Sequence, residues 1–250
     1  MSLFKNIGTF RNWTVHYRNR FRFASDKGKR GVLEFRNGLS LQFRYHTSDL
    51  ATSRSIFVDD SYFPPGISIG PDATVLDIGG HIGTLTLLAA SRAPQGRVFT
   101  FEPEPENFAL LEENVRRNGF QQVRCFNLAA AGREEEREFY LAPNPVRTGS
   151  HSLTRVGTAG SVKVRCTTLS AILRDNKIDR VDLLKLDCEG AEWEIFPATS
   201  DEDLGKIRQI VMEVHAGESG AQEKSFDRLK KLGFVALPHP KSNYAAFVRR

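Results

Sequence analysis

The chain has 250 residues, of which 40% are hydrophobic and 26% charged, a balance that fits one large globular domain or one domain with an N-terminal extension. This composition excludes a disordered chain, a collagen-like chain and a small disulfide scaffold. The longest uncharged stretch, Ile78 to Ser91, is shorter than the roughly 20 residues of a membrane-spanning helix, and the first residues lack the apolar core of a signal peptide, so we predict a cytoplasmic protein.

Positive charge is concentrated at the N-terminus. Residues 1–54 hold 11 Lys and Arg residues but only three acidic ones, which gives this segment a net charge of +8. Arg18, Arg20 and Arg22 stand among aromatic residues, a mixture that could contact nucleic acid, an anionic membrane surface or an acidic substrate. We favour a solvated face whose aromatic side chains pack inward, because charge patches alone predict partners poorly. Residues 1–23 show no clear period and receive no assignment.

Residues 31–44 predict a β-hairpin, because alternating apolar residues flank Asn37-Gly38, a pair that accepts positive φ at both turn positions. The prolines and glycines of residues 61–72 break helices and mark a connection. We therefore divide the chain into an N-terminal extension, residues 1–60, and a main domain, residues 61–250, whose regular alternation begins near Asp72.

Short apolar runs alternate with helical segments through most of the main domain. The predicted strands are 74–78, 97–101, 123–127, 181–186 and 209–214, and the predicted helices are 83–92, 105–118, 168–175 and 191–196. This alternation predicts a parallel sheet with right-handed crossovers, an α/β doubly wound fold. After a helix at 222–232, residues 234–237 and 244–248 predict a terminal antiparallel strand pair.

An insertion at residues 137–166 interrupts the alternation. It contains two predicted short strands, 138–141 and 162–166, around a loop rich in Pro, Gly and Ser. Such an insertion is a candidate lid over the strand ends, and the small polar residues of 148–153 could contact sugar hydroxyls. The three cysteines, Cys125, Cys166 and Cys188, are widely spaced and odd in number, which predicts buried thiols instead of a metal pair or a disulfide framework.

Residues 75–83 predict a buried strand that runs into a glycine turn. In a doubly wound sheet, ligands bind at the carboxyl ends of the strands, where Gly79 and Gly83 let a backbone approach a cofactor. A dinucleotide fingerprint ending at Gly83 would require glycine at position 78, and Ile78 breaks it. Asp77 places a carboxylate at the strand end, which repels phosphate and attracts an amine. The reactive part of the ligand is therefore expected to be cationic.

Glu102 ends the second predicted strand, 19 residues beyond Gly83, at the spacing where an acid accepts both hydroxyls of a ribose. A ribose with an amine-bearing tail and no phosphate site describes S-adenosylmethionine better than ATP or NAD. His81 is expected to shape the pocket of this cofactor and not to transfer a proton. The predicted cofactor-binding residues are Asp77, Gly79, Gly80, His81, Gly83, Glu102, Pro103 and Asn127.

From about Tyr62 to Val214 the chain resembles the FkbM-type S-adenosylmethionine-dependent methyltransferases. The resemblance depends on the glycine-turn block 75–83, on block 101–108 with the residues that follow it, and on block 184–192, which is the most specific. It implies the Rossmann-like class I methyltransferase fold and O-methylation of a hydroxyl on a sugar or natural product. Over residues 1–60 the resemblance is weak, and substrate choice often lies in such variable parts.

The predicted catalytic residues are Asp187, Glu189 and His215. Asp187 follows the fourth apolar strand, which lies beside the glycine turn if the strand order is the usual one, and Glu213 and His215 project to one face at the end of the next strand. A hydroxyl is a poor nucleophile until a general base takes its proton. His215 has the best matched pKa, whereas Asp187 or Glu189 could orient the hydroxyl or accept its proton. A strand-end histidine satisfied by backbone groups stays open as the alternative for His215.

Three alternatives are weighed against this interpretation. Asp187, Glu189, Glu213 and His215 could hold magnesium or manganese. Our prediction for the site nevertheless includes no metal. The basic N-terminus keeps an RNA ribose methyltransferase open, and a nucleotide-binding module without catalysis is the third option. We expect a small-molecule or glycan acceptor as the partner, no nucleic acid and no membrane span, and the oligomeric state stays open.

Overall fold

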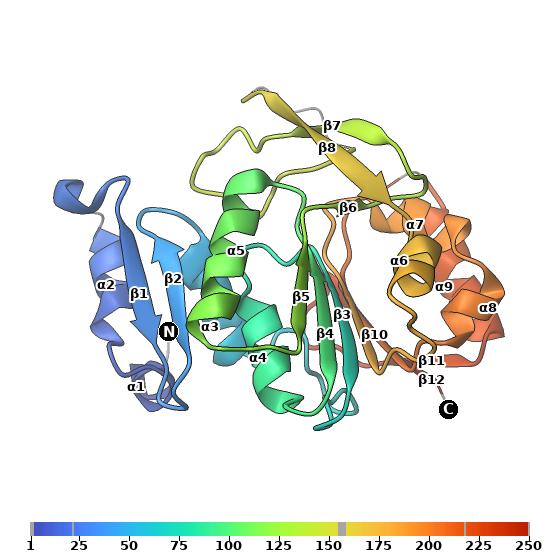
Figure 1. The fold of residues 1–250 in the computed structure, drawn as a ribbon, viewed down its shortest axis with the longest axis horizontal. Helices are drawn as coiled ribbons and strands as arrows, with labels where there is room; N and C mark the ends of the chain where they lie inside the picture. Colours follow the sequence, from blue (N-terminus) through green and yellow to red (C-terminus); the bar gives the residue numbers. More distant parts are fainter. Residues whose placement is uncertain (1–2, 22, 155–158, 218, 250) are drawn as a thin grey trace.

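The computed structural model describes residues 3–21, 23–154, 159–217 and 219–249, and Figure 1 shows a central sheet with helices on both sides. Arg22, part of the predicted basic face, lies outside the described residues. The main sheet has seven strands in the order β11-β12-β10-β9-β3-β4-β5. These strands are β3 (Thr74–Ile78), β4 (Arg97–Phe101), β5 (Val123–Phe126), β9 (Leu183–Leu186), β10 (Gln209–Glu213), β11 (Phe234–Leu237) and β12 (Tyr244–Arg249).

The pairing confirms the predicted doubly wound sheet. β10, β9, β3, β4 and β5 run parallel to one another, whereas β12 pairs antiparallel with both β10 and β11 and so forms the predicted terminal pair. β9 lies directly beside β3, as the placement of Asp187 near the glycine turn requires. The fourth strand is shorter than predicted, because Val181 forms a separate bridge with Ile207 before the ladder begins at Leu183.

Helices form a layer on each face of this sheet (Figure 1). One layer contains α3 (Asp49–Phe57), α4 (Thr84–Arg92) and α5 (Pro105–Arg117), and the other contains α6 (Leu169–Asp175), α7 (Glu192–Ala198), α8 (Asp201–Gly205) and α9 (Ala221–Lys231). The helices α3 and α8 were not predicted. Both are short and rich in polar residues, so neither carries a strong apolar period.

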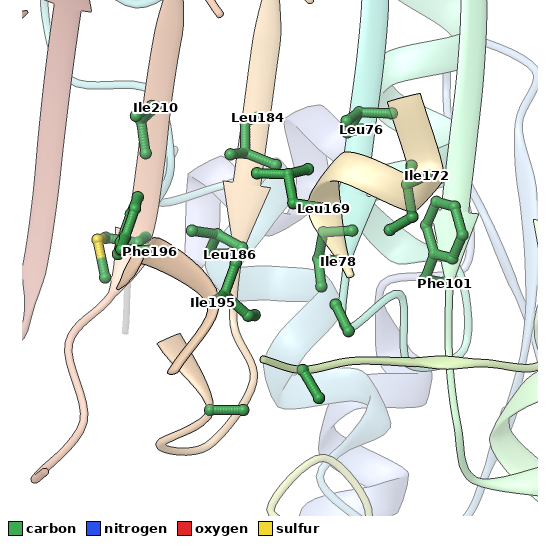
Figure 2. Packing of buried hydrophobic residues seen from close by; sticks show 14 of the residues in the cluster. Leu76, Ile78, Phe101, Leu169, Ile172, Leu184, Leu186, Ile195, Phe196 and Ile210 are labelled. Carbon is green, nitrogen blue, oxygen red and sulfur yellow. The ribbon is translucent and has the colours of Figure 1, made fainter. Parts of the chain in front are cut away.

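Alternation along the buried strands sends side chains to the two helical layers in turn. In β3, Val75 packs in the cluster that includes α4, whereas Leu76 and Ile78 pack in the cluster that includes α6 and α7. Figure 2 shows this second cluster, in which Leu184 and Leu186 of β9 lie beside the side chains of β3, with Leu169 of α6 between the two in this view. Continuous apolar runs result, because both faces of these parallel strands are buried.

Besides α3, the N-terminal extension contains α1 (Leu3–Thr9), α2 (Thr14–Phe21), a 3₁₀ turn (Ala24–Asp26) and the predicted hairpin, β1 (Arg30–Glu34) with β2 (Ser40–Arg44). The hairpin is confirmed, but its turn is wider than the two-residue turn expected. In this described loop Gly38 alone has positive φ, 92°, and Asn37 instead accepts a bond from the Leu39 amide at 3.2 Å. The Phe35 amide still donates to the Leu39 carbonyl at 2.9 Å, so residues 36–38 form a three-residue turn in which Gly38 is the left-handed residue.

Two asparagines at the end of α5 hold the hairpin to the main domain: Asn114 in its last turn and Asn118, which caps it. Asn114 accepts from the Gln42 amide at 2.6 Å and donates to the Gln42 carbonyl at 3.0 Å, and Asn118 makes the same pair with Ser40 at 2.9 and 2.7 Å. Each side-chain amide thus replaces a strand partner at the edge of β2. Leu41 of the hairpin also shares one buried cluster with Leu110 and Leu111 of α5, so the extension and the main domain have a common core.

A second, three-stranded sheet lies across one end of the main sheet (Figure 1). Its strands are β6 (Ala129–Ala130), β7 (Glu136–Tyr140) and β8 (Ser161–Thr167), in the order β6-β8-β7. β7 and β8 are the two strands predicted within the insertion, and β6 was not predicted. Among the described residues, no helix has both the length and the apolar character needed to cross a membrane.

Candidate active site

A cavity of about 310 Å³ opens at the carboxyl ends of β3, β4, β9 and β10, beneath the loop that joins β7 to β8. Of the predicted site residues, the following line it: Gly79, His81, Glu102, Pro103, Asp187 and Glu189. The lining does not include the remaining predicted residues, Asp77, Gly80, Gly83, Asn127 and His215. The cavity therefore brings the predicted cofactor side and the predicted acidic side of the site into one space.

The glycine turn is packed directly against its neighbours. Gly79 has φ 81°, and a Cβ atom there would lie 2.0 Å from the Asp187 carbonyl oxygen. A Cβ atom at Gly80 would lie 2.3 Å from Oγ1 of Thr100, and one at Gly83 would lie 2.8 Å from the Leu111 side chain. Only glycine lets the turn pass this close to β9 and α5 while its backbone faces the cavity.

Asp77 and Lys185 form a buried ion pair under the turn. They are register partners in β3 and β9, and Lys185 Nζ lies 3.3 Å from Asp77 Oδ1 and donates to the Gly79 carbonyl at 2.5 Å. Burial opposes the charged ammonium, but the Asp77 and Asp187 carboxylates outweigh it and raise the pKa of Lys185. The negative charge of Asp77 is therefore balanced by Lys185 inside the protein. The predicted contact of Asp77 with a cofactor stays a prediction.

Glu102 is buried at the end of β4 with its carboxylate turned toward the glycine turn. One oxygen accepts from the His81 amide at 2.8 Å and the other from the Glu104 amide at 3.0 Å. Burial raises the pKa of Glu102 to about 7, although these backbone bonds favour the charged form. Asn127 donates to the Glu102 carbonyl at 2.9 Å, so it supports this strand end from outside the cavity.

A polar network joins the extension, the glycine turn and the insertion loop. Asp49 of α3, fully buried, accepts from Arg44 and from Thr148 Oγ1 at 2.7 Å. His81 Nε2 lies 3.0 Å from the same Thr148 oxygen, and burial lowers the pKa of His81 to about 4. His81 is thus neutral, and its Nδ1, which is buried, has no hydrogen-bond partner among the described residues. A ligand in the cavity could supply that partner.

The acidic side of the cavity is made by the ends of β9 and β10. Asp187 Oδ2 accepts from the Tyr62 hydroxyl at 2.7 Å, and Glu213 Oε2 accepts from the Tyr244 hydroxyl at 3.1 Å. His215 Nε2 lies 3.9 Å from Asp187 Oδ1 and 4.0 Å from Glu213 Oε1. The prediction that the ends of these strands meet is confirmed in the structure.

Glu189 precedes α7 and Glu192 is its first residue, but the two carboxylates have different surroundings. Glu192 is fully buried, and its carboxylate accepts from the Cys188 and Gly190 amides at 2.8 Å and lies 2.9 Å from His215 Nδ1. Glu189 instead lines the cavity, with Oε2 3.5 Å from His215 Nε2. Burial alone would lower the pKa of His215, but Glu192 and the neighbouring carboxylates raise it. The alternative in which only backbone groups satisfy this ring does not describe the structure.

Sequence reasoning missed several polar residues of the site. Tyr62 comes from the Pro-rich connection, where no periodic signal marks it. Tyr244 is the register partner of Glu213, so pairing the predicted last strand with β10 could have found it. Asp49 belongs to a helix that was not predicted, and its contact with Thr148 joins residues 99 positions apart.

Comparison with known proteins gives consistent matches. The sequence model of a family described as methyltransferase FkbM domain matches residues 77–235. The AMB antimetabolite synthetase AmbE of Pseudomonas aeruginosa is 33% identical over 213 residues, which cover 72% of this chain but only 10% of that protein. The 31-O-demethyl-FK506 methyltransferase FkbM of Streptomyces tacrolimicus is 28% identical over 74% of this chain and 81% of its own length. The hexuronic acid methyltransferase AglP of Haloferax volcanii is 27% identical over 58% of this chain and 57% of its own length.

Among solved structures, a methyltransferase FkbM from Methylobacillus flagellatus superposes with a TM-score of 0.54 at 13% identity, over 75% of this chain and 46% of that chain. At this identity the likeness concerns the fold, and the chain spans about half of that structure. The shared fold agrees with the expected class I architecture. The family match and the fold are thus two separate observations, and both agree with a methyltransferase domain.

Proposed function

The chain belongs to the FkbM methyltransferase domain family, and from that membership we propose that it is an S-adenosylmethionine-dependent O-methyltransferase acting on a hydroxyl of a sugar or natural product. The observation that carries the proposal is the cavity itself, in which Glu102 and the glycine turn face the carboxylates of Asp187 and Glu189. A cofactor with a ribose and a cationic centre suits one side of this space. An acceptor whose proton must be removed suits the other.

The residues present fit this cofactor. Glu102 offers two carboxylate oxygens at the end of β4, where the ribose hydroxyls are expected, and the unpartnered Nδ1 of His81 can accept from a donor in the cavity. When bound, S-adenosylmethionine supplies a methyl group on a positively charged sulfur. The acidic end of β9 favours such a charge within the cavity.

Asp187 and Glu189 are the residues that we assign to the acceptor. Both line the cavity, and the Tyr62 hydroxyl fixes the Asp187 carboxylate at 2.7 Å. Asp187 would position the acceptor hydroxyl, and Glu189 or His215 would take its proton, since a positioned base near the nucleophile is what this chemistry needs. Thr148 and its neighbours, which cover the cavity from the insertion loop, are placed to contact other polar groups of the acceptor.

Relatives support the direction of transfer to oxygen. The 2-O-methyltransferase NoeI of Sinorhizobium fredii is 26% identical over 57% of this chain, and AglP is a methyltransferase of hexuronic acid. These are properties of those proteins. For this chain, they support a hydroxyl acceptor on a sugar or similar small molecule.

Titration calorimetry tests the cofactor. We expect S-adenosylmethionine and S-adenosylhomocysteine to bind, and NAD and ATP to bind weakly or not at all. Glu102→Ala removes the ribose acceptor and should cost on the order of 1–3 kcal/mol of binding free energy. The matched control is Glu106→Ala, which removes an exposed acid at the start of α5. Equal affinity in the two variants would refute the role of Glu102, and tight NAD binding would refute the proposal.

A further inference from the structure

We propose that Asp187, Glu213 and His215 form a binding site for one divalent cation of the Mn²⁺ or Mg²⁺ class at the acidic end of the cavity. The ligand atoms would be Asp187 Oδ1, Glu213 Oε1 and His215 Nε2. That these residues bind a cation is inferred from their positions and charges. Its use in catalysis rests on the proposed function.

The three donors lie close enough for one ion. Their ligand atoms all fall within 4.8 Å of one another, with Nε2 of His215 at 3.9 Å from Asp187 and 4.0 Å from Glu213. Bonds of about 2.1 Å place neighbouring ligands of an octahedral ion about 3 Å apart. Rotations that move each side chain by about 1 Å would therefore close the site. Two carboxylates and one imidazole are a donor set that Mn²⁺ accepts, and Mg²⁺ accepts the oxygens.

Each donor is oriented by a partner from outside the trio. Tyr62 holds the other oxygen of Asp187, Tyr244 holds the other oxygen of Glu213, and Glu192 holds the other nitrogen of His215. The side-chain amide of Asn243 donates to Glu213 Oε1 itself at 2.9 Å, so an ion at this oxygen would share or replace that hydrogen bond. Outer partners of this kind fix the tautomer and the direction of metal ligands. Because they come from the connection before β3, from β12 and from α7, three separate elements aim the donors at one point.

The orientation of His215 also favours a cation at this point. With Nδ1 directed at Glu192, Nε2 faces Asp187, Glu189 and Glu213 at 3.5 to 4.0 Å. A nitrogen lone pair among three carboxylates is repulsive, so this point needs a proton or a cation. One proton leaves four carboxylates around a single imidazolium. Lys185, the cation nearest to Asp187, lies 3.9 Å from its Oδ2 and is closer to Asp77. A divalent ion balances the remaining charge better.

The position of the site gives the ion a use. Asp187 and Glu213 line the cavity, so coordination positions not taken by protein would face the space assigned to the acceptor. A cation there would hold the acceptor oxygen and lower the pKa of its hydroxyl. With His215 engaged as a ligand, Glu189 is the carboxylate left to take the proton. The ion would thus orient and acidify the nucleophile without touching the cofactor.

The test uses the full chain and Mn²⁺ alone, followed by electron paramagnetic resonance of the free aqua ion. We expect one site, with affinity reduced on the order of 100-fold in Asp187→Asn, Glu213→Gln and His215→Gln. Tyr244→Phe, which removes only an outer partner, should lose about 10-fold. The control Glu194→Gln removes another carboxylate of α7, one paired with Arg137 away from the cavity, and should bind as the parent does. Denaturation midpoints without Mn²⁺ verify that each variant is folded.

The outcomes separate the two proposals. No Mn²⁺ binding by the parent at millimolar concentration, or equal binding by the three ligand variants and the control, overturns the cation site. If a ligand variant does not fold, Tyr244→Phe decides: an affinity equal to the parent's overturns the site. Methyl transfer that persists unchanged in a chelator also overturns its catalytic use, while the proposed function stands. Mn²⁺ binding without any S-adenosylmethionine binding keeps the site and overturns the function.

Discussion

Asp187 uses its two carboxylate oxygens for different purposes. Oδ2 is held by Tyr62 and lies near Lys185, whereas Oδ1 faces the group around His215. The residue thus lies between the ion pair that supports the glycine turn and the side of the cavity assigned to the acceptor. A carboxylate fixed at one oxygen keeps the other in place for a reacting group.

We expect Asp187→Asn to lower kcat by about 10²-fold or more while S-adenosylmethionine binds within a few fold of the parent, because a carboxylate that positions the acceptor hydroxyl for loss of its proton matters most in the transition state. Asparagine keeps the shape and an oxygen for Tyr62. Single-turnover rates and calorimetry on one preparation give both numbers. The exposed Asp179→Asn serves as a control. A normal rate in Asp187→Asn would move the role to Glu189 and His215.

Glu102 should make stability depend on pH. Burial raises its pKa from the usual 4.5 to about 7 in the folded protein. Between these values the folded state binds more protons than the unfolded chain, so this contribution is complete below pH 4.5 and is lost as the pH rises through 7. The slope reaches about 1.4 kcal/mol per pH unit. Glu102→Gln should remove it.

Urea denaturation of the cofactor-free parent and of Glu102→Gln, from pH 5 to pH 8, measures this effect. The difference between the two curves isolates Glu102 from other titrating groups. The parent should lose stability relative to the variant as the pH rises. Parallel curves would show that Glu102 titrates alike in the folded and unfolded states.

At the scale of elements, the glycine turn is where β3, β9 and α5 meet. Gly79→Ala would place a Cβ atom 2.0 Å from the Asp187 carbonyl oxygen at φ 81°, so the backbone must move. We expect the free energy of unfolding to fall by more than about 3 kcal/mol and cofactor binding to be lost as well. Gly119→Ala is the matched control. It also has positive φ, 69°, but nothing within 4 Å, and should cost only about 1–2 kcal/mol. Equal losses in chemical denaturation would contradict the packing argument.

The positive charge of the whole molecule is concentrated on the extension, where three arginines form ion pairs and most of the excess charge stays in place. Arg18 pairs with Asp26, Arg44 with Asp49, and Arg54 with Asp59. Phe4, Phe21 and Phe23 are exposed, so the prediction that the aromatic side chains beside Arg18 and Arg20 pack inward is wrong. Phe10, Phe35 and Phe43 are instead buried in one cluster with residues of α5. Because these aromatic side chains pack against the main domain, we predict that the extension serves acceptor recognition or association and does not bind nucleic acid.

We predict that the full chain binds a single-stranded RNA oligonucleotide weakly. Fluorescence anisotropy at 50 and 200 mM salt measures this directly. RNA binding that matters for function would be tight at low salt and fall by orders of magnitude across this range. Such a result would favour the RNA ribose methyltransferase over a small-molecule acceptor.

The sequence by itself determined most strands and helices of the main domain, although not β6 and α8, together with the glycine turn and the acidic strand ends. These are local patterns: continuous apolar runs, Gly79 and Gly83 after a strand, and Asp187 after another. The polarity of a parallel sheet then requires all carboxyl ends to meet at one edge. That is why Glu102, Asp187 and Glu189 could be predicted to share a site before any contact was known.

Only the tertiary structure decided the partners of those residues. Register places Lys185 beside Asp77, and chain folding brings Tyr62 to Asp187 across 125 positions and Thr148 to Asp49 across 99. The attachment of the extension to the main domain was not predicted for the same reason. The side-chain amide of Asn114 completes the edge of a strand 72 residues earlier in the chain. Side chains in irregular segments carry no period, and a buried polar group is identified only by the partner that folding gives it.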